Sequence, residues 1–343
     1  MKYKSNKGAN FWIFARKYLH EYMPVTRSLS GKSVEAYKQA LKDYISFLND
    51  VKSIKDENIC FDMFSFDYFN RFIKYLKDKK LKNKSINLKI TAIRSFLKFC
   101  SIEDFELRGL YEESKKIVKL KTPKQPIEYL QPEATKAILS AFKGETAKSR
   151  RNRMIMILMY DTGGRVQEIA DLNVSSLHLS HKNPFITLVG KGRKTRNVPL
   201  LDKTVQHLHA YIKEFHTTNK EGPLFYSKLD GKPHRISTDS ISLILKRAAD
   251  IGRKTCPLVP SSNKIHCHLI RKTKAMDLYR NNIPLPFIMQ LLGHESMSTT
   301  SGFYAFATLE MMSEAINKAS PEIKEVDKKW KTEEFKKVLY SLD

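Results

Sequence analysis

The stretch KLKTPKQPIEYLQPEA, residues 119–134, contains three prolines and several lysines and has no regular spacing of apolar residues. Proline restricts the backbone and removes a hydrogen-bond donor, so this composition is typical of a linker. The chain has 343 residues, 41% of them hydrophobic, which is enough for a core on each side of that linker. We therefore expect two domains, residues 1–118 and 128–320, joined by a linker at 119–127 and followed by a tail at 321–343.

The segment before the linker shows only helical patterns. In SVEAYKQALKDYISFLND, residues 33–50, apolar side chains recur every three or four positions, and Ser33 is suitably placed as the N-cap. The same spacing recurs over residues 66–78 and 83–100. The first domain is therefore predicted to be all-helical.

The segment after the linker has a mixed pattern. An apolar helix is predicted to end at the Thr-Gly-Gly of residues 162–164, and β-rich flanks around a Gly-Lys-Gly turn predict a hairpin over residues 184–200. A loop is expected around DGKPHR, residues 230–235, with helices from there to the end. The predicted fold class is mainly α, with a small β-sheet in the second domain.

The balance of charge points to a polyanionic partner. The chain carries 61 Lys and Arg against 36 Asp and Glu, a formal net charge of +25. Because no apolar run approaches the roughly 20 residues of a membrane span, nucleic acid is favoured over a membrane. The four cysteines are scattered, without the paired spacing of a zinc site, so we expect no metal, no cofactor and a reducing cytoplasm.

Six side chains stand where they could handle a phosphate group: Arg165, Lys191, His268, Arg271, His294 and Tyr304. Arg165 follows two glycines at a helix start, and Lys191 lies at the tip of the predicted hairpin. His268 and Arg271 are three positions apart and therefore share one helix face. Taken one at a time, such residues are more often structural than catalytic.

The order of four segments along the chain favours a catalytic interpretation of these residues over a structural one. The segments are TGGRVQEIADL at 162–172, GKGRKTRNVPL at 190–200, HLIR at 268–271 and LLGHESMSTTSGFY at 291–304. Together they resemble the four signature segments of the tyrosine recombinase (phage integrase) family. The linker and the N-terminal helices are similar, more loosely, to that family's core-binding domain. The resemblance implies an all-helical core-binding domain and a mixed catalytic domain that form a C-shaped clamp around duplex DNA, and we expect two domains only.

The resemblance also implies a role for each residue. Arg165 and Arg271 match the two arginines, Lys191 the hairpin lysine, His268 and His294 the two histidines, Tyr304 the nucleophile and Glu168 an acidic position that helps to orient the site. No metal or cofactor belongs to this set. The spacing between His294 and Tyr304 is one residue longer than in many members, which leaves the path of that loop open.

These residue types suit phosphodiester chemistry. Guanidinium forks pair with the non-bridging oxygens, so a site without a metal can neutralise the phosphate, and His294 would add a hydrogen bond to it. A phenol with a pKa of about 10 needs help in losing its proton, and His268 is the candidate for that task. Lys191 is the candidate general acid for the leaving 5′ oxygen, and Tyr304 would hold the DNA as a 3′-phosphotyrosyl ester.

A run of charge, KDKKLKNK at residues 77–84, the helix after it and the hairpin are predicted to contact DNA. The candidate residues are Lys77, Lys79, Lys80, Lys82, Lys84, Lys89, Arg94, Arg193, Lys194 and Arg196. Tyr160 and Tyr279 are rivals to Tyr304 as nucleophile, but both stand in apolar helical patterns and are interpreted as packing residues.

Several roles fit this resemblance. Integration, excision or transposition of a mobile element comes first; the alternatives are a chromosome-dimer-resolving recombinase, a type IB topoisomerase-like nicking-closing enzyme and a non-catalytic DNA-binding regulator. The family implies a homo-tetramer on specific double-stranded DNA sites, in the bacterial cytoplasm, and an accessory DNA-bending or directionality protein is a further candidate partner. The tail at 321–343, which includes Trp330, is either docked into a neighbouring protomer or folded back on its own domain.

Overall fold

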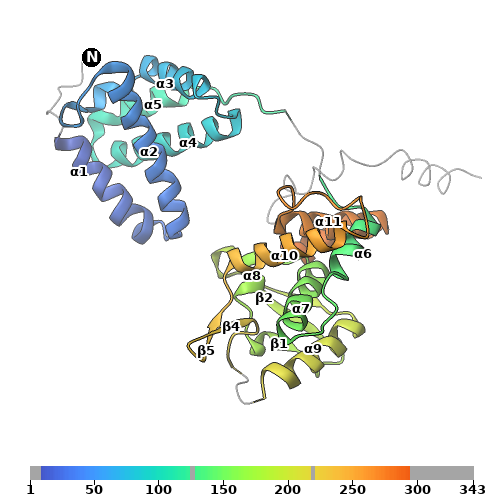
Figure 1. Cartoon of the computed structure of the whole chain (residues 1–343). Coiled ribbons are helices and arrows are strands. Elements are labelled where there is room, and N and C mark those ends of the chain that lie inside the picture. Colours follow the sequence, from blue (N-terminus) through green and yellow to red (C-terminus); the bar gives the residue numbers. More distant parts are fainter. Residues whose placement is uncertain (1–8, 124–127, 218–220, 294–343) are drawn as a thin grey trace, which may run out of the picture. The chain divides into compact units, whose positions relative to one another are not determined.

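The computed structural model describes residues 9–123, 128–217 and 221–293 (Figure 1). The chain divides into two compact units between residues 125 and 126, a point that falls inside the linker expected at 119–127. Each unit has its own hydrophobic core. No helix in the described ranges is long and apolar enough to cross a bilayer.

Helices are the only regular secondary structure among the described residues of the first unit, which confirms the all-helical prediction (Figure 1). Its main helices are α1 (Ala9–Lys17), α2 (Gly31–Lys52), α3 (Phe66–Asp78), α4 (Asn83–Glu103) and α5 (Arg108–Lys115). Between them lie a π-helical segment η1 (Tyr18–Thr26) and the short 3-10 turns η2 (Asp56–Asn58), η3 (Phe61–Phe64) and η4 (Phe105–Leu107).

Helix α2 begins three residues earlier than the sequence indicated. Its N-cap is Ser30, whose backbone is extended and whose hydroxyl oxygen accepts the amide hydrogen of Ser33 at 3.4 Å. The prediction of Ser33 as the N-cap was therefore wrong, because Ser33 occupies the third helical position and donates to the cap.

Aromatic side chains fill the core of the first unit. Tyr44 of α2 is fully buried and lies between two rings, with centroid distances of 4.7 Å to Phe64 and 4.8 Å to Phe72. Its hydroxyl donates to the backbone carbonyl of Met63 at 2.6 Å, which satisfies the one polar group that this ring buries. The packing joins α2, α3 and η3 into one body.

The second unit combines helices with two small antiparallel sheets, so the predicted fold class, mainly α with a small sheet, is confirmed (Figure 1). Its helices are α6 (Pro132–Leu139), α7 (Ala147–Thr162), α8 (Val166–Ala170), α9 (Asp202–Phe215), α10 (Thr238–Arg253), α11 (Cys267–Arg280) and α12 (Leu285–Leu292). The strands are β1 (Leu177–His178), β2 (Phe185–Val189), β3 (Thr195–Pro199), β4 (Tyr226–Leu229) and β5 (Lys232–Arg235), with 3-10 turns η5 (Val174–Ser176) and η6 (Lys191–Arg193).

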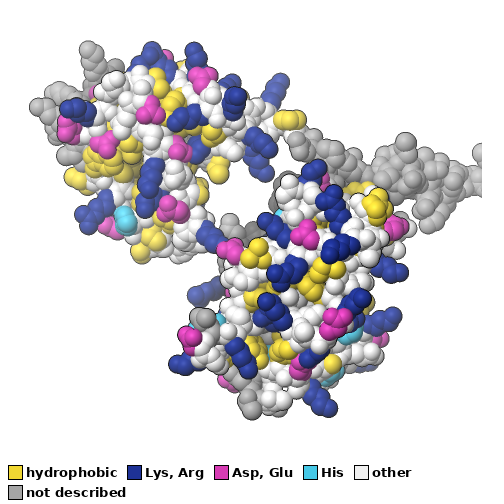
Figure 2. Space-filling view, in the orientation of Figure 1, with side chains coloured by type: hydrophobic (Ala, Val, Ile, Leu, Met, Phe, Trp, Pro, Cys, Tyr) yellow, Lys and Arg dark blue, Asp and Glu magenta, His cyan; other side chains and the backbone are white. Residues whose placement is uncertain are grey.

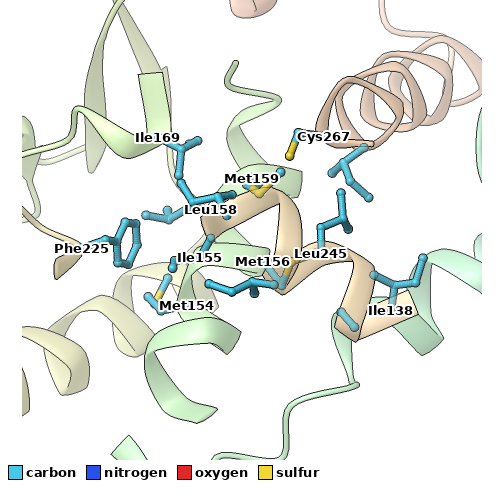
Figure 3. Close-up of a cluster of buried hydrophobic side chains, with 14 of the residues drawn as sticks. Ile138, Met154, Ile155, Met156, Leu158, Met159, Ile169, Phe225, Leu245 and Cys267 are labelled. Carbon is cyan, nitrogen blue, oxygen red and sulfur yellow. The ribbon is translucent and has the colours of Figure 1, made fainter. Parts of the chain in front are cut away.

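Helix α7 is the central element of the second unit. Figure 3 shows its Ile155 and Leu158 meeting Ile169 and Phe225 on one side, while Met156 faces Leu245 on the other. A helix that is apolar around most of its circumference belongs inside a core. Helix α7 ends at Thr162, and the residues that follow it begin the candidate site.

The predicted hairpin over residues 184–200 is present as β2 and β3, which pair antiparallel from Phe185 opposite Pro199 to Val189 opposite Thr195. Ile186 and Leu188 of β2 are buried, as is Val198 of β3. Strand side chains alternate between two faces, so this register presents one face of the hairpin to the core.

The segment around DGKPHR is not the loop that the sequence indicated. It forms a second hairpin, β4 paired with β5, in which Leu229 lies opposite Lys232. Asp230 and Gly231 occupy its tip with φ values of 49° and 74°. Positive φ at both central residues is the geometry of the tight hairpin turn that Asp-Gly favours.

Candidate active site

The candidate site begins at the turn that ends α7. Gly163 has a φ of 56°, and a Cβ placed there would lie 2.7 Å from Cδ2 of Leu292. A Cβ on Gly164 would lie 2.9 Å from Cδ1 of Ile169. The turn from α7 to α8 passes between Leu292 of α12 and Ile169 of α8, and it therefore requires two residues without side chains. This turn places Arg165 directly before α8.

Glu168 is the buried anion of the site, with a side chain that is only 3% exposed. Its Oε2 accepts the backbone amide of Arg165 at 2.8 Å, and its Oε1 accepts Nη1 of the same residue at 2.8 Å. Burial alone would raise the pKa of Glu168, but the hydrogen bonds from Arg196 and Arg165 outweigh it and hold that pKa below its ordinary value. The carboxylate is therefore charged at neutral pH and fixes the Arg165 side chain.

Arg196 of β3 completes the pairing of Glu168. Its Nη1 and Nη2 donate to the two carboxylate oxygens at 2.9 and 2.6 Å, and its Nε donates to the carbonyl of Leu291 at 2.8 Å. The side chain is 11% exposed. The guanidinium thus binds a carboxylate and a helix end inside the unit, and the DNA contact expected for Arg196 stays a prediction.

Arg271 of α11 is almost completely buried, at 2% exposure. Its Nη1 donates to the carbonyl of Gly163 at 2.9 Å and its Nη2 to the carbonyl of Leu292, while its Nε has no partner among the described residues. Burial, with a smaller contribution from Arg165, lowers the pKa of Arg271 to about 9, so the side chain still carries its charge at neutral pH. A buried cation with a donor to spare is suited to an anionic ligand.

His268 lies one turn ahead of Arg271 on the same helix. Partial burial, together with the nearby cations of Arg271 and Lys272, lowers the pKa of His268 to about 4. The imidazole is therefore neutral at pH 7 and able to accept a proton. His266, two residues earlier, has a different task, because its Nδ1 accepts the amide of Leu269 at 3.1 Å as the N-cap of α11.

The hairpin that carries Lys191 stands next to this cluster. A Cβ on Gly190 would lie 3.2 Å from Oε1 of Glu168 and 3.7 Å from Nη1 of Arg165. The amide of Gly190 also donates to the carbonyl of Lys194 at 2.7 Å, which closes the turn in which Lys191 is the first residue of η6. The hairpin turn that bears Lys191 therefore begins directly against the arginine cluster.

Two of the predicted catalytic residues, His294 and Tyr304, and the tail at 321–343 lie outside the described residues. The rival tyrosines have packing roles, as interpreted from the sequence. Tyr279 packs on a small apolar cluster of α11 and α12, and the hydroxyl of Tyr160 donates to Oδ2 of Asp277 at 2.7 Å. Burial and this hydrogen bond raise the pKa of Tyr160 well above its ordinary value, which opposes its use as a nucleophile.

Two predicted DNA contacts in the first unit are used internally instead. Arg94 donates to the backbone carbonyls of Ser114 and Ile117, and Lys89 pairs with Asp43. These side chains tie α4 to α5 and α2, and the DNA contacts expected for them stay predictions. The predicted lysines at the junction of α3 and α4 are exposed: Lys77, Lys79, Lys80, Lys82 and Lys84.

The candidate site therefore brings together four predicted residues, Arg165, Glu168, His268 and Arg271, and one whose role the sequence did not reveal, Arg196. Cations surround a single buried carboxylate, and the Arg165 side chain remains 40% exposed. No cluster of three or more potential metal ligands occurs within the described ranges. Such an arrangement can bind a phosphate and place a neutral proton acceptor beside it.

Comparison with known families gives two matches along this chain. The profile of the Phage integrase family matches residues 128–310, and that of the "Phage integrase, N-terminal SAM-like domain" matches residues 17–103. The two matched regions correspond to the two units of the fold.

Individual proteins are similar over most of their length. Tyrosine recombinase XerC of Pediococcus pentosaceus is 30% identical over 308 residues, which cover 88% of this chain and 96% of the relative. Tyrosine recombinase XerD of Oceanobacillus iheyensis is 30% identical over 288 residues, covering 81% and 89%. Among solved structures, the Tn1549 transposon integrase in complex with transposon right end DNA has a TM-score of 0.67 at 15% identity, covering 90% of this chain and 99% of that one.

Proposed function

Because the chain belongs to the phage integrase family, the tyrosine recombinases, which are DNA strand-transferring enzymes, we propose that it is a site-specific recombinase with Tyr304 as its nucleophile. The observation that carries the proposal is the convergence of Arg165 and Arg271 on the end of α12, directly before His294, with a neutral His268 on α11.

The proposed reaction exchanges one phosphoester bond for another. The Tyr304 oxygen attacks the phosphorus, the bond to the 5′ oxygen breaks, and a 3′-phosphotyrosyl ester forms. His268 accepts the phenol proton, and Lys191 gives a proton to the leaving 5′ oxygen. A second 5′-hydroxyl then attacks the ester and releases Tyr304, so neither ATP nor a metal is required for rejoining.

Arg165 and Arg271 supply what this transition state needs. Charge builds on the non-bridging oxygens as the nucleophile arrives, and fixed guanidinium groups stabilise it more than they stabilise the ground state. Arg165 is held from one side by Glu168, while Arg271 is held by the carbonyls of Gly163 and Leu292. Because both forks are already oriented, little reorganisation is needed at the moment of reaction.

DNA binding is part of the proposal and is supported by the charge of the chain and by the DNA complexes among the structurally similar proteins. Figure 2 shows Lys and Arg side chains spread over the visible faces of both units. The exposed lysines between α3 and α4, with Arg193 and Lys194 of the hairpin, are the proposed phosphate contacts. Each phosphate neutralised releases counterions, so binding should weaken steeply as salt is raised.

For the biological role we favour integration, excision or transposition of a mobile element, carried out by a homo-tetramer. Chromosome-dimer resolution is the second candidate, and the relatives named XerC and XerD favour it. The location of the recombined site separates the two roles. Sites in the DNA that flanks the gene support a mobile element, whereas a single site elsewhere in the host chromosome supports dimer resolution.

The proposed activity is tested with a supercoiled plasmid that carries two directly repeated copies of a candidate site. A recombinase is expected to convert it into two smaller circles, and the matched plasmid without sites should stay intact. Relaxation of both plasmids without new circles would instead indicate a topoisomerase. Tight binding to the sites with neither product would indicate a DNA-binding regulator.

A further inference from the structure

Three consecutive carbonyls at the end of α12 each accept a hydrogen bond from a different arginine. The pairs are Arg196 with Leu291, Arg271 with Leu292, and Arg165 with Gly293. The N···O distance is 2.8 Å for Arg196 and 3.1 Å for Arg165. The three arginines come from β3, α11 and the turn before α8, so this helix end joins three separate elements.

This arrangement has a clear physical basis. The last carbonyls of a helix lack intrahelical partners and carry the negative end of the helix dipole, so cations are stabilised there. Three like charges in one place repel one another, and the carboxylate of Glu168 offsets that repulsion by pairing with two of them. The end of α12 and Glu168 together therefore form the frame that holds the arginines.

Arg196 differs from the other two arginines in how its donors are used. Its Nε and both terminal nitrogens bind protein acceptors, and its side chain is 11% exposed against 40% for Arg165. It also lies against the Gly293 turn, where a Cβ would come within 3.1 Å of its Cδ and Nη1. Gly293 has a φ of 63° and is the last residue before His294, so Arg196 touches the point where the chain leaves α12.

We propose that Arg196 is a positioning residue of the recombinase site. By holding Glu168 it orients Arg165, and by holding Leu291 and packing on Gly293 it fixes the turn that leads into His294. It does so without touching DNA. The inference rests on the proposed function, since only a phosphate-handling site gives these orientations a chemical consequence.

The variant that tests this role best is Arg196→Lys. It keeps the positive charge, but a single ammonium group cannot span both oxygens of Glu168 and the carbonyl of Leu291. The matched control is Arg150→Ala, which removes a second two-pronged Arg–Glu pair, Arg150 with Glu214. Arg150 lies in the first turn of α7, at the opposite end from Gly163.

Two readouts on DNA separate positioning from phosphate contact. At saturating DNA we expect Arg196→Lys to lower the rate of covalent adduct formation by about 10- to 100-fold, as expected when a transition-state donor is misplaced. Its affinity for DNA and the salt dependence of that affinity should match wild type. A weaker affinity with a smaller salt slope and an unchanged rate at saturation would make Arg196 a phosphate contact and overturn the inference.

A third readout needs no DNA and separates this inference from the proposed function. The amide of Gly293 donates to the carbonyl of Gln290 at 3.1 Å, so its hydrogen exchange reports on the last turn of α12. Arg196→Lys should speed that exchange in the free protein, and Arg150→Ala should not. If exchange is faster in Arg196→Lys but wild-type protein forms no adduct, the proposed function is refuted and the positioning role is not. If exchange in Arg196→Lys equals that of wild type, the positioning role is refuted, whatever the activity.

Discussion

Replacing Arg271 by alanine is expected to lower the rate of DNA cleavage at saturating DNA by about 10²- to 10³-fold, the usual loss for one fixed donor to a developing oxyanion. Arg271 is 2% exposed, donates to the carbonyls of Gly163 and Leu292, and has an Nε without a partner among the described residues. Its removal takes away a charge at the proposed phosphate site and the link between α7 and α12. Single-turnover cleavage of a labelled duplex measures the loss.

The control for this experiment is Arg280→Ala, which removes a guanidinium from the same helix. Arg280 donates to the hydroxyl of Tyr129 at 2.8 Å and takes no part in the arginine cluster. Its loss should leave the cleavage rate unchanged. Because Arg271→Ala will also loosen the fold, both variants are compared at a temperature where each is fully folded. A rate for folded Arg271→Ala close to that of wild type would contradict the assigned role.

Replacing Glu168 by alanine is expected to destabilise the second unit by about 3–5 kcal/mol, the typical effect of removing one partner from a buried ion pair. The carboxylate is 3% exposed and pairs with both Arg165 and Arg196. Without it, two guanidinium groups face each other without an anion between them. Urea unfolding of the full chain, followed by a signal from the second unit, measures the change.

The pH dependence of this effect has a definite sign. The pKa of Glu168 is lowered in the folded protein, so the unfolded chain binds more protons at acid pH. The stability that Glu168 contributes is therefore complete above its ordinary pKa and is lost as pH falls through the folded value. The difference in unfolding free energy between wild type and Glu168→Ala should persist at neutral pH and disappear under acid conditions.

The control for the size of the effect is Glu214→Ala, because the partner of Glu214, Arg150, is exposed. If Glu214→Ala lowered the unfolding free energy as much as Glu168→Ala does, burial would not be the reason for the effect.

The helices and the first hairpin could be predicted because their side chains repeat with the period of the element. Helices α3 and α4 show apolar residues at three- and four-residue spacing, and the buried members of those sets include Phe69, Phe72 and Ile86. Strands β2 and β3 flank a Gly-Lys-Gly turn with β-branched residues. In both cases the local preference and the buried face agree.

The second hairpin was missed because its strands carry little of that pattern. Strand β5 reads Lys-Pro-His-Arg, and all four residues are exposed. A proline within a short polar run argues against a strand. The Asp-Gly turn at its tip was the one available signal, and two-residue turns of this type are the strongest local mark of a hairpin.

The roles of the arginines could be assigned only where a motif carried them. The resemblance matches Arg165 and Arg271 to residues with a role, whereas it gave no role to Arg196, although Arg196 stands in the GKGRKTRNVPL segment, and Arg94 and Arg196 were assigned to DNA on charge. A sequence does not say which carbonyl or carboxylate lies near a charged side chain. For Arg196 a signal did exist. It is two positions from the buried Val198 on the same strand and lies opposite the buried Leu188, so its side chain points to the inward face of the hairpin.

Covalent trapping on DNA tests directly whether Tyr304 is the nucleophile. Nicked duplexes drawn from the DNA that flanks the gene are incubated with wild type, Tyr304→Phe and Tyr160→Phe, and the products are separated on a denaturing gel. A protein–DNA adduct is expected for wild type and Tyr160→Phe and none for Tyr304→Phe. An adduct that persists in Tyr304→Phe would show that another residue is the nucleophile.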